Sequence, residues 1–320
     1  MANKAGDNNE FCPNVFSNCR HDRRRFLQKL CWGTMGAISS QAVLRNAYSA
    51  QGGEGSNEAT PAKLPTIKIG NYHLTRLIAG SNPVEGFSHS TRNLASHMNE
   101  YFTVEQTVKF ISRCEKLGIN TWQSGHGPVK KVTGALEKLR EQGSKIHWMC
   151  LYLEKSPVQK SIKDILALKP IAIIHHGGAT DAIFRAGKMQ KVHDFVKMVH
   201  DAGVMAGISA HNPANIAYIE EKGWENDFFM GCFYHVSRPK QEIREKLGTI
   251  PLGELFLESD PDEMTKVIQQ VKRPCLGFKI LAAGRNCWTS NSVESAFKYA
   301  FNNIKKTDGV IVGMYPRFSD

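Results

Sequence analysis

Residues 171–213 decide the fold, since they begin with IAIIHHG at 171–177 and end with VMAGISAHNP at 204–213. Each of these two stretches is a short apolar run that closes on polar residues, which predicts a β-strand. The residues between them have the pattern of a helix. One unit of strand, helix and strand is therefore expected here, with histidines where both strands end.

The same alternation of strand and helix continues in both directions along the chain. Three helix starts have capping signals, at Thr103, Ser156 and Asp260. The eight predicted strands are Arg76–Ala79, Asn120–Gln123, His147–Leu153, Ile171–His175, Met205–Ala210, Phe228–Phe233, Cys275–Leu281 and Val310–Gly313. Eight strands at about 32 residues per unit predict an α/β fold of the (β/α)8 TIM-barrel type. An open doubly wound sheet is the rival, although no G-x-G-x-x-G follows the first strand.

Both ends of the predicted barrel have features of their own. Thr66–Ile69 and Tyr72–Leu74 flank Gly70-Asn71, which predicts a short β-hairpin before the first barrel strand. The sequence stops about seven residues after Gly313. The last helix is therefore expected to be short or missing.

Composition is that of an ordinary globular protein. Hydrophobic residues make up 41% and charged residues 22% of the 320, which excludes a wholly disordered chain. No run approaches about 18 apolar residues, so stable insertion into a membrane is not expected. The net charge is +11, and the first fifty residues contribute seven basic and three acidic side chains to it. The remaining excess is too thinly spread for a nucleic-acid-binding protein.

The first fifty residues resemble a bacterial twin-arginine (Tat) export signal. Arg23-Arg24-Arg25-Phe26-Leu27 precedes a moderately apolar stretch, and Ala47-Tyr48-Ser49-Ala50 supplies small residues near a cleavage site. This resemblance implies a signal peptide over 1–50, the Tat translocase as a partner, and a periplasmic or exported location. An amphipathic N-terminal helix with a basic patch is the alternative. Residues 51–64 are expected to form a flexible linker and 65–320 the TIM-barrel catalytic domain.

Five cysteines follow the predicted signal peptide: Cys114, Cys150, Cys232, Cys275 and Cys287. The number is odd and no C-x-x-C pair occurs among them, so neither a disulfide framework nor a zinc ribbon is indicated. Cys150, Cys232 and Cys275 lie in apolar runs, where a free cysteine behaves as a small core residue.

Lys279 is the sharpest functional signal, because it interrupts the apolar run of the seventh strand. A lysine turned toward the helix layer would bury an unpaired ammonium, so the side chain is expected to face the barrel interior. There it suits proton transfer, a Schiff base or anion binding. A structural ion pair with Glu154, at the end of the third strand, is the alternative.

Histidines gather where the predicted strands end. His175 and His176 are adjacent, so strand alternation turns their rings to opposite faces. His176 and His211, together with Glu154, offer two imidazoles and a carboxylate for a divalent metal ion, although no short ligand spacing supports this site. His126 follows the second strand and is either a general acid or a solvated loop residue. Four other histidines are interpreted as surface residues: His89, His97, His193 and His200.

The connection from Tyr234 to Ser259 is long for a compact barrel. Such connections usually form a lid or a binding loop, and a buttress over the side of the barrel is the alternative. Residues predicted to contact a substrate lie in this connection and at the strand ends: Asn82, Gln123, Tyr234, Arg238 and Phe278.

Six short motifs follow one another along residues 66–318. They are GINTWQS at 118–124, IIH at 173–175, GISAHNP at 207–213, Phe233–Arg238, KILAAG at 279–284 and Asp308–Met314. In this order and at this spacing they resemble the aldo/keto reductase superfamily. The resemblance implies a (β/α)8 barrel whose floor is plugged by the N-terminal hairpin, with chemistry at the barrel mouth.

The catalytic tetrad of that superfamily is largely absent from this sequence. Gln123 stands at the aspartate position, and His126 is the nearby acid because no tyrosine follows. The lysine position falls near Cys150 or Leu151. Only the histidine is kept, as His175.

The nicotinamide site that the resemblance implies is only partly kept. Ser209 remains of the pair that holds the carboxamide, whereas Ala210 replaces the asparagine, and Phe278 supplies the stacking ring. The phosphate-binding segment after the eighth strand is mostly missing. With a predicted exported location, these departures argue against ordinary hydride transfer from NAD(P)H.

The sequence is compatible with three functions. The first is an exported isomerase, epimerase or lyase acting on a sugar or keto-sugar, with Lys279 and either His126 or His175 as acid and base and with a divalent metal as a possible aid. Its sugar substrate is inferred from the polar strand ends and from Trp122, Trp148 and Trp288. The second is an NAD(P)H-dependent oxidoreductase that uses His126. The third is a catalytically silent sugar-binding barrel.

Overall fold

A computed structural model of the protein describes residues 63–125, 129–153 and 162–318. The predicted signal peptide and most of the predicted linker lie outside these residues, as do His126 and Glu154.

Eight parallel strands close into a barrel in the order β10, β3, β4, β5, β6, β7, β8, β9. Their bounds are β3 Leu77–Gly80, β4 Thr121–Gly125, β5 His147–Tyr152, β6 Ala172–His175, β7 Met205–Ala210, β8 Phe228–Cys232, β9 Cys275–Phe278 and β10 Gly309–Gly313. Val310 and Leu77 are paired in parallel, so the last strand closes the sheet on the first. The predicted (β/α)8 TIM barrel is confirmed.

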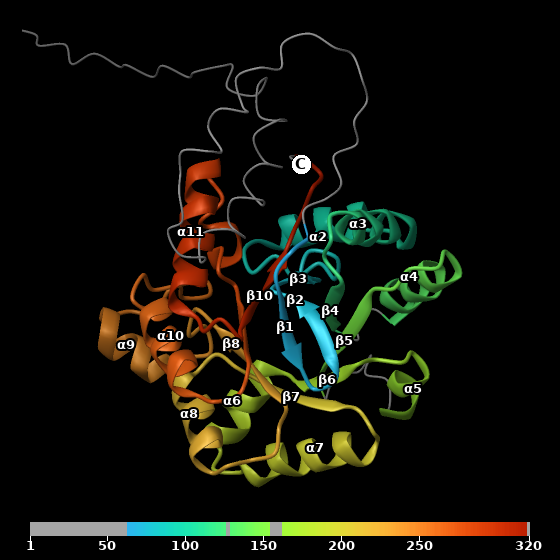
Figure 1. Cartoon of the computed structure of the whole chain (residues 1–320). Coiled ribbons are helices and arrows are strands. Elements are labelled where there is room, and N and C mark those ends of the chain that lie inside the picture. Colours follow the sequence, from blue (N-terminus) through green and yellow to red (C-terminus); the bar gives the residue numbers. More distant parts are fainter. Residues whose placement is uncertain (1–62, 126–128, 154–161, 319–320) are drawn as a thin grey trace, which may run out of the picture. The chain divides into compact units, whose positions relative to one another are not determined.

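Helices surround the strands (Figure 1). They are α2 Arg92–Tyr101, α3 Val104–Lys116, α4 Val129–Glu141, α5 Ile162–Ala167, α6 Gly177–Arg185, α7 Gln190–Asp201, α8 Pro213–Glu221, α9 Lys240–Leu247, α10 Asp260–Gln270 and α11 Ser290–Asn303, with a 3-10 turn η2 at Ala282–Gly284. The Thr103 side chain accepts from the Gln106 backbone N–H and caps α3, as its sequence predicts. Within the described residues no helix follows β10, in agreement with the expectation for the last helix.

The hairpin formed by β1 (Thr66–Ile69) and β2 (Tyr72–Thr75) plugs the floor of the barrel. Figure 1 shows it lying across the middle of the ring of strands. Ile67, Ile69 and Leu74 are buried in one core cluster with strand residues from around the barrel, such as Met149 and Leu276. The apolar face of the hairpin therefore fills the end of the barrel where the strands begin.

Strand register shows which side chains face the interior. Met149 is paired with Gln123 on one side and Ala172 on the other, and all three share the inward face with the core cluster. By the same alternation, Leu276 and Phe278 of β9 point inward. Gln123 is buried near the top of this face.

The structure corrects the length of the seventh barrel strand. Cys275–Leu281 is predicted, but β9 ends at Phe278, and Lys279 has a φ of 59°. Lys279 thus follows the strand in a left-handed backbone conformation, which residues other than glycine rarely adopt. The apolar residues after it led to the error, because their pattern does not reveal the turn.

Buried cysteines and tryptophans belong to the core. Cys114, Cys150, Cys232 and Cys275 are free and buried, and Cys287 is free and exposed. Trp122 and Trp148 are also buried, and Trp148 Nε1 donates a hydrogen bond of 2.7 Å to Ser124 Oγ. The two residues are neighbours in the strand register and are buried, so they do not support the inference of a sugar substrate that was drawn from them, whereas Trp288 is exposed.

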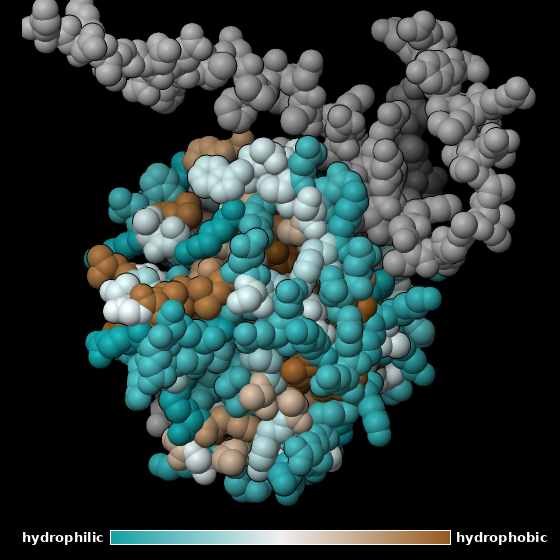
Figure 2. Space-filling view, turned by 90° about the vertical axis from the view of Figure 1, so that its left-hand side faces the viewer, coloured by the Kyte–Doolittle hydropathy of each residue, from teal (hydrophilic) through white to brown (hydrophobic). Residues whose placement is uncertain are grey.

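The outer surface is mainly hydrophilic on the face that carries α9, α10 and α11, where hydrophobic side chains gather in small groups (Figure 2). None of the helices among the described residues is both long enough and apolar enough to cross a membrane.

The plug should matter for stability. Replacing Leu74, which is fully buried, with alanine is expected to lower the free energy of unfolding by about 2–5 kcal/mol, because it leaves a cavity between hairpin and barrel. Lys68→Ala, at an exposed position of the same hairpin, should change it by less than about 0.5 kcal/mol. Urea unfolding measures both variants, and equal losses would contradict the role of the plug.

Candidate active site

Three ionisable side chains meet beyond the carboxyl end of β9, and we call them the mouth triad: Lys279, His89 and Glu254. Lys279 Nζ lies 3.1 Å from His89 Nε2, and His89 Nδ1 lies 2.9 Å from both carboxylate oxygens of Glu254. Asn82 Nδ2 lies 3.0 Å from the same Nε2 atom. The three members come from the segments after β3, β8 and β9, which the barrel brings to one end.

The donor pattern fixes the tautomer of His89. A lysine ammonium has donors only, so Nε2 of the imidazole must accept the hydrogen bond from Lys279. The ring proton is then on Nδ1 and is donated to Glu254. Burial would raise the pKa of the Glu254 carboxyl, but the hydrogen bond from His89 and the positive charge of Lys279 hold it below its usual range.

Two residues of the mouth triad have left-handed backbones. His89 has a φ of 52° and Lys279 a φ of 59°. A left-handed backbone costs a residue other than glycine roughly 1–2 kcal/mol, and such residues persist where the surroundings hold them, often at functional sites. Arg285 helps to hold this pair, since it donates to the His89 carbonyl oxygen at 3.3 Å and stacks over the Phe256 ring at 3.9 Å.

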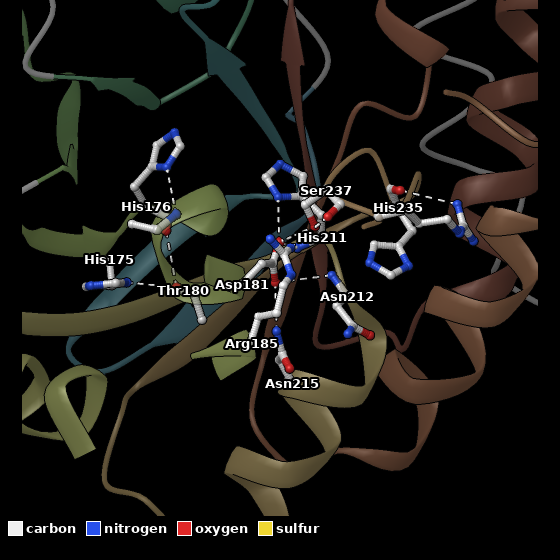
Figure 3. A network of polar contacts seen from close by, with 12 residues as sticks. His175, His176, Thr180, Asp181, Arg185, His211, Asn212, Asn215, His235 and Ser237 are labelled. Atoms are coloured by element: carbon white, nitrogen blue, oxygen red, sulfur yellow. Dashed lines mark hydrogen bonds and ion pairs between the residues drawn. The ribbon is translucent and has the colours of Figure 1, made fainter. Parts of the chain in front are cut away.

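A second imidazole is held by a buried carboxylate at the end of β7. Asp181 Oδ2 accepts from His211 Nδ1 at 2.9 Å, from the His211 backbone N–H at 3.0 Å and from Ser237 Oγ at 2.7 Å. Its Oδ1 accepts from Asn215 Nδ2 at 2.8 Å. Burial would raise the pKa of Asp181, but these hydrogen bonds, and first among them the one from His211, lower it overall. Figure 3 shows Asp181 at the centre of this network.

Gly177 leaves the space that His211 occupies. A Cβ at Gly177 would lie 2.9 Å from Ser209 Oγ and 3.0 Å from His211 Cε1. Contacts this short would force the imidazole to move. The glycine pair after His176 therefore lets the start of α6 approach the end of β7 closely.

Phe278 links the two groups. Its ring packs edge to face against the His211 ring, with 5.6 Å between centroids, and Lys279 Nζ lies over the same ring at 5.3 Å from its centroid. One carboxylate-held imidazole and one ammonium thus flank this inward-facing ring, and the second imidazole contacts the ammonium. Of the residues predicted from sequence, the structure brings together Lys279, His211, Phe278 and Asn82.

His175 does not reach the mouth. It is buried, its Nδ1 lies 2.7 Å from Thr180 Oγ1, and its ring packs against Phe195 of α7 with 4.9 Å between centroids. Burial lowers its pKa to about 4. The acid–base role predicted for His175 is therefore corrected to a structural one, because the strand turns the ring outward, away from His211 (Figure 3). His176 caps α6, and its Nδ1 accepts from the Ala179 N–H.

Arg238 is also corrected, from substrate contact to structural clamp. Its side chain is only 1% exposed and donates to both carboxylate oxygens of Asp260, at 2.9 and 2.6 Å. It also donates to Glu242 at 3.1 Å. These bonds tie the connection after β8 to the start of α10, so no donor faces the barrel mouth.

Tyr234 and Gln123 border the site without joining either cluster. The Tyr234 hydroxyl accepts from Asn286 Nδ2 at 3.3 Å, and its ring packs on Phe256. Gln123 lies on the inward face of β4. The long connection after β8 supplies Glu254 and Phe256 to the mouth, which is the placement expected of a lid.

The predicted metal ligands are not all within the described part of the chain, since Glu154 lies outside it. Among the described residues no group of three His, Cys, Asp or Glu side chains is placed to hold a metal ion. The metal site on Glu154, His176 and His211 stays a prediction, and so does the role of His126.

Three important side chains escaped the sequence reasoning. His89 was interpreted as a surface residue, but its side chain is 20% exposed and belongs to the mouth triad. Asp181 did have a signal, since it is an acidic residue on the buried face of α6 and such a residue needs a partner. Glu254 had no signal beyond its place in the long connection.

Two cavities lie away from the mouth triad. One of about 290 Å³ is bordered by Thr66, Thr75 and Asn120 at the floor of the barrel. The other, of about 220 Å³, is bordered by Asp181, the carboxylate that holds His211, and by Asn212 and His235. We place the candidate site at the mouth because chemistry in such barrels occurs where the strands end and because the ionisable groups converge there.

Comparisons with known proteins agree with this fold. Two solved structures from Pseudomonas aeruginosa, provisionally assigned as aldo-keto reductases, are similar to the chain with TM-scores of 0.52 and 0.53. They are 13% and 14% identical in sequence; each comparison covers 80% of this chain and 92% or 93% of the other. No family model and no curated protein matches the sequence. The barrel therefore has an aldo-keto reductase-like fold, and identity this low shows the fold alone.

The residues present do not fit the nicotinamide cofactor that this fold implies. Phe278, the ring expected to stack on nicotinamide, has the Lys279 ammonium over its face and the His211 ring against its edge. His175 faces α7, and Gln123 replaces the acidic residue. The described residues after β10 contain no helix N-terminus for a phosphate.

The neutral His175 makes stability depend on pH. Its pKa of about 4 in the folded state lies below the ordinary histidine value of 6.5, so the unfolded chain binds the extra proton between these values. The contribution of His175 should therefore lower the free energy of unfolding by about 3 kcal/mol as the pH drops from 6.5 to 4. In His175→Gln that part of the loss should disappear, as measured by urea unfolding at pH 7 and pH 4.

His97→Gln, at an exposed position, is the control and should keep the pH dependence of the parent protein. If His175→Gln lost as much stability in acid as the parent, the assignment of a buried neutral ring would be wrong.

Proposed function

We propose that this chain is an enzyme that carries out acid–base chemistry on a sugar or keto-sugar at the mouth of its barrel. The reaction class is isomerase, epimerase or lyase. One observation supports this most strongly: an imidazole held at Nδ1 by a carboxylate, that of His211, and the Lys279 ammonium flank the ring of Phe278. The same ammonium contacts a second imidazole, that of His89, which is also held at Nδ1 by a carboxylate. Such groups move protons and balance charge, whereas the residues for hydride transfer are replaced.

His211 is the base in this proposal. Asp181 accepts a hydrogen bond from the N–H at Nδ1 of His211, so the lone pair of the neutral ring is on Nε2. An imidazole fixed in this way removes a proton from the carbon next to a carbonyl, and the carboxylate stabilises the imidazolium that forms. Asp181 is itself fixed by four further hydrogen bonds, so the ring orientation is set before substrate arrives.

Lys279, with His89 beside it, supplies the positive charge that stabilises the reaction intermediate. When the proton leaves the substrate carbon, negative charge develops on the carbonyl oxygen, and an ammonium near that oxygen stabilises it. Asn82, bonded to the same imidazole nitrogen, offers its amide to a substrate hydroxyl. An aromatic ring bordered by amide and charged groups suits a polyhydroxylated substrate, and for this reason we propose a sugar or keto-sugar.

An exported location is part of the proposal, since residues 1–50 resemble a Tat signal, with the Tat translocase as partner and the periplasm as destination. The second candidate function is NAD(P)H-dependent reduction, which only the fold similarity favours. Quenching of tryptophan fluorescence by NADPH at micromolar concentrations would support this second candidate and count against ours.

Exchange of substrate protons with solvent tests the base. The parent protein should catalyse deuterium incorporation from D2O next to the carbonyl of a keto-sugar, observed by NMR. In His211→Asn the rate should fall about 100-fold or more, the usual contribution of a general base. Asparagine keeps a donor for Asp181, and circular dichroism checks that the variant is folded.

His200→Asn is the matched control, since His200 Nε2 is also paired with a carboxylate, at 2.9 Å from Asp227, but on α7 far from the mouth. It should exchange at the parent rate. Equal rates in the parent and His211→Asn would overturn the assignment of His211.

A divalent metal would supply a Lewis acid, and Glu154, His176 and His211 are the residues proposed to hold it. A metal ion on Nε2 of His211 would replace that atom as the base, so the metal site is an alternative to the base. Under this alternative, elemental analysis of purified protein finds about one divalent ion per chain, reduced in His176→Ala. Metal-free protein with full exchange activity would contradict this part of the proposal and leave the acid–base part intact.

A further inference from the structure

The closest polar partner of Lys279 among the described residues is a base. Its Nζ lies 3.1 Å from His89 Nε2, which carries no proton in the tautomer fixed by Glu254. A lysine that serves only as a structural cation is normally found against a carboxylate. Here the carboxylate of Glu254 bonds to the imidazole of His89, and the imidazole stands between it and Lys279.

We propose that Lys279 is a nucleophile that forms a Schiff base with the carbonyl carbon of the substrate, with His89 as its proton acceptor and donor. This inference rests on the proposed function, because it names how the carbonyl substrate is held and activated. It replaces the electrostatic role of the Lys279 ammonium there, since the positive charge that draws electrons is now on the iminium nitrogen. An amine attacks a carbonyl only when deprotonated, and an adjacent base is one of the ways in which proteins activate it.

The chemistry balances within these two side chains. His89 takes one proton from the Lys279 ammonium, the nitrogen lone pair forms a bond to the carbonyl carbon, and His89 returns the proton to the oxygen. A second proton moves from nitrogen to His89 and then to the hydroxyl, which leaves as water while the C=N bond forms. The result is an iminium with one N–H, one water molecule and a neutral His89.

Glu254 is the positioning residue for this shuttle. Its carboxylate accepts a hydrogen bond from the N–H at Nδ1 of His89, so the imidazole is stabilised each time it becomes positively charged. The left-handed backbones of His89 and Lys279 hold the two nitrogen atoms together at some conformational cost.

The iminium also gives a role to the second cluster. A protonated C=N bond draws electrons from the neighbouring carbon, so a C–H or C–C bond next to it breaks more easily. His211, whose ring contacts the same Phe278 side chain as Lys279, is the base that would take that proton. The substrate class is therefore an aldehyde or ketone with a free carbonyl, such as an open-chain keto-sugar, and the reaction class is cleavage or isomerisation through an enamine.

Reductive trapping tests this inference. The full protein is incubated with dihydroxyacetone and cyanoborohydride at neutral pH, and modified lysines are located by peptide mass mapping. Lys279 should be labelled at least about tenfold faster than an exposed lysine such as Lys298, whose side chain is 62% exposed. Labelling of Lys279 no faster than Lys298 would overturn the proposal.

Three variants sharpen the test. His89→Asn removes the base while asparagine tolerates the left-handed backbone, so labelling of Lys279 should fall about tenfold in a protein that still folds. Lys279→Arg keeps the charge but cannot form the adduct, so deuterium exchange should be lost. Lys298→Met is the control for both measurements and should match the parent.

The outcomes separate this inference from the proposed function. Deuterium exchange that persists in Lys279→Arg, without trapping at Lys279 in the parent, removes the Schiff base and keeps acid–base catalysis by His211. Trapping at Lys279 without exchange by the parent keeps the nucleophile and removes the isomerase proposal. Absence of both removes the two together.

Discussion

Side chains alternate between two faces along each of the eight parallel strands, and this constraint decides which residues can do chemistry here. The hairpin and the core around Met149 and Leu276 fill the inward face, so polar groups can meet only beyond that packing. His211 and Lys279 each directly follow the last residue of a strand and meet this condition. His175 still belongs to its strand, faces α7 and is kept neutral by burial.

The fold could be predicted from the sequence because apolar runs, helix caps and the hairpin turn are local signals. Met205–Ala210 was placed at its observed bounds, since small and apolar residues end there at a polar group. The end of β9 could not be placed this way. Its apolar pattern continues past Lys279, and the side chain at the left-handed turn contacts His89, which is 190 residues away and leaves no local signal.

The candidate site was only half predictable for a related reason. Lys279, His211, Phe278 and Asn82 lie at strand ends, which a topological argument can find. Their partners obey no such rule, because Asp181 is 30 residues before His211, on a helix, and Glu254 is 165 residues after His89, in a long connection. Pairing of this kind depends on how the layers pack.

The poor fit to a nicotinamide ring and the reactive lysine that we propose have one structural cause. A flat cofactor ring and an ammonium compete for the same face of Phe278, and in this barrel Lys279 occupies it. Placing the amine there requires the strand to end at Phe278 and the backbone to turn, which moves Ile280 and Leu281 out of the strand. On our proposal, the geometry of one strand end is enough to place carbonyl chemistry in a barrel of this fold where hydride transfer would otherwise occur.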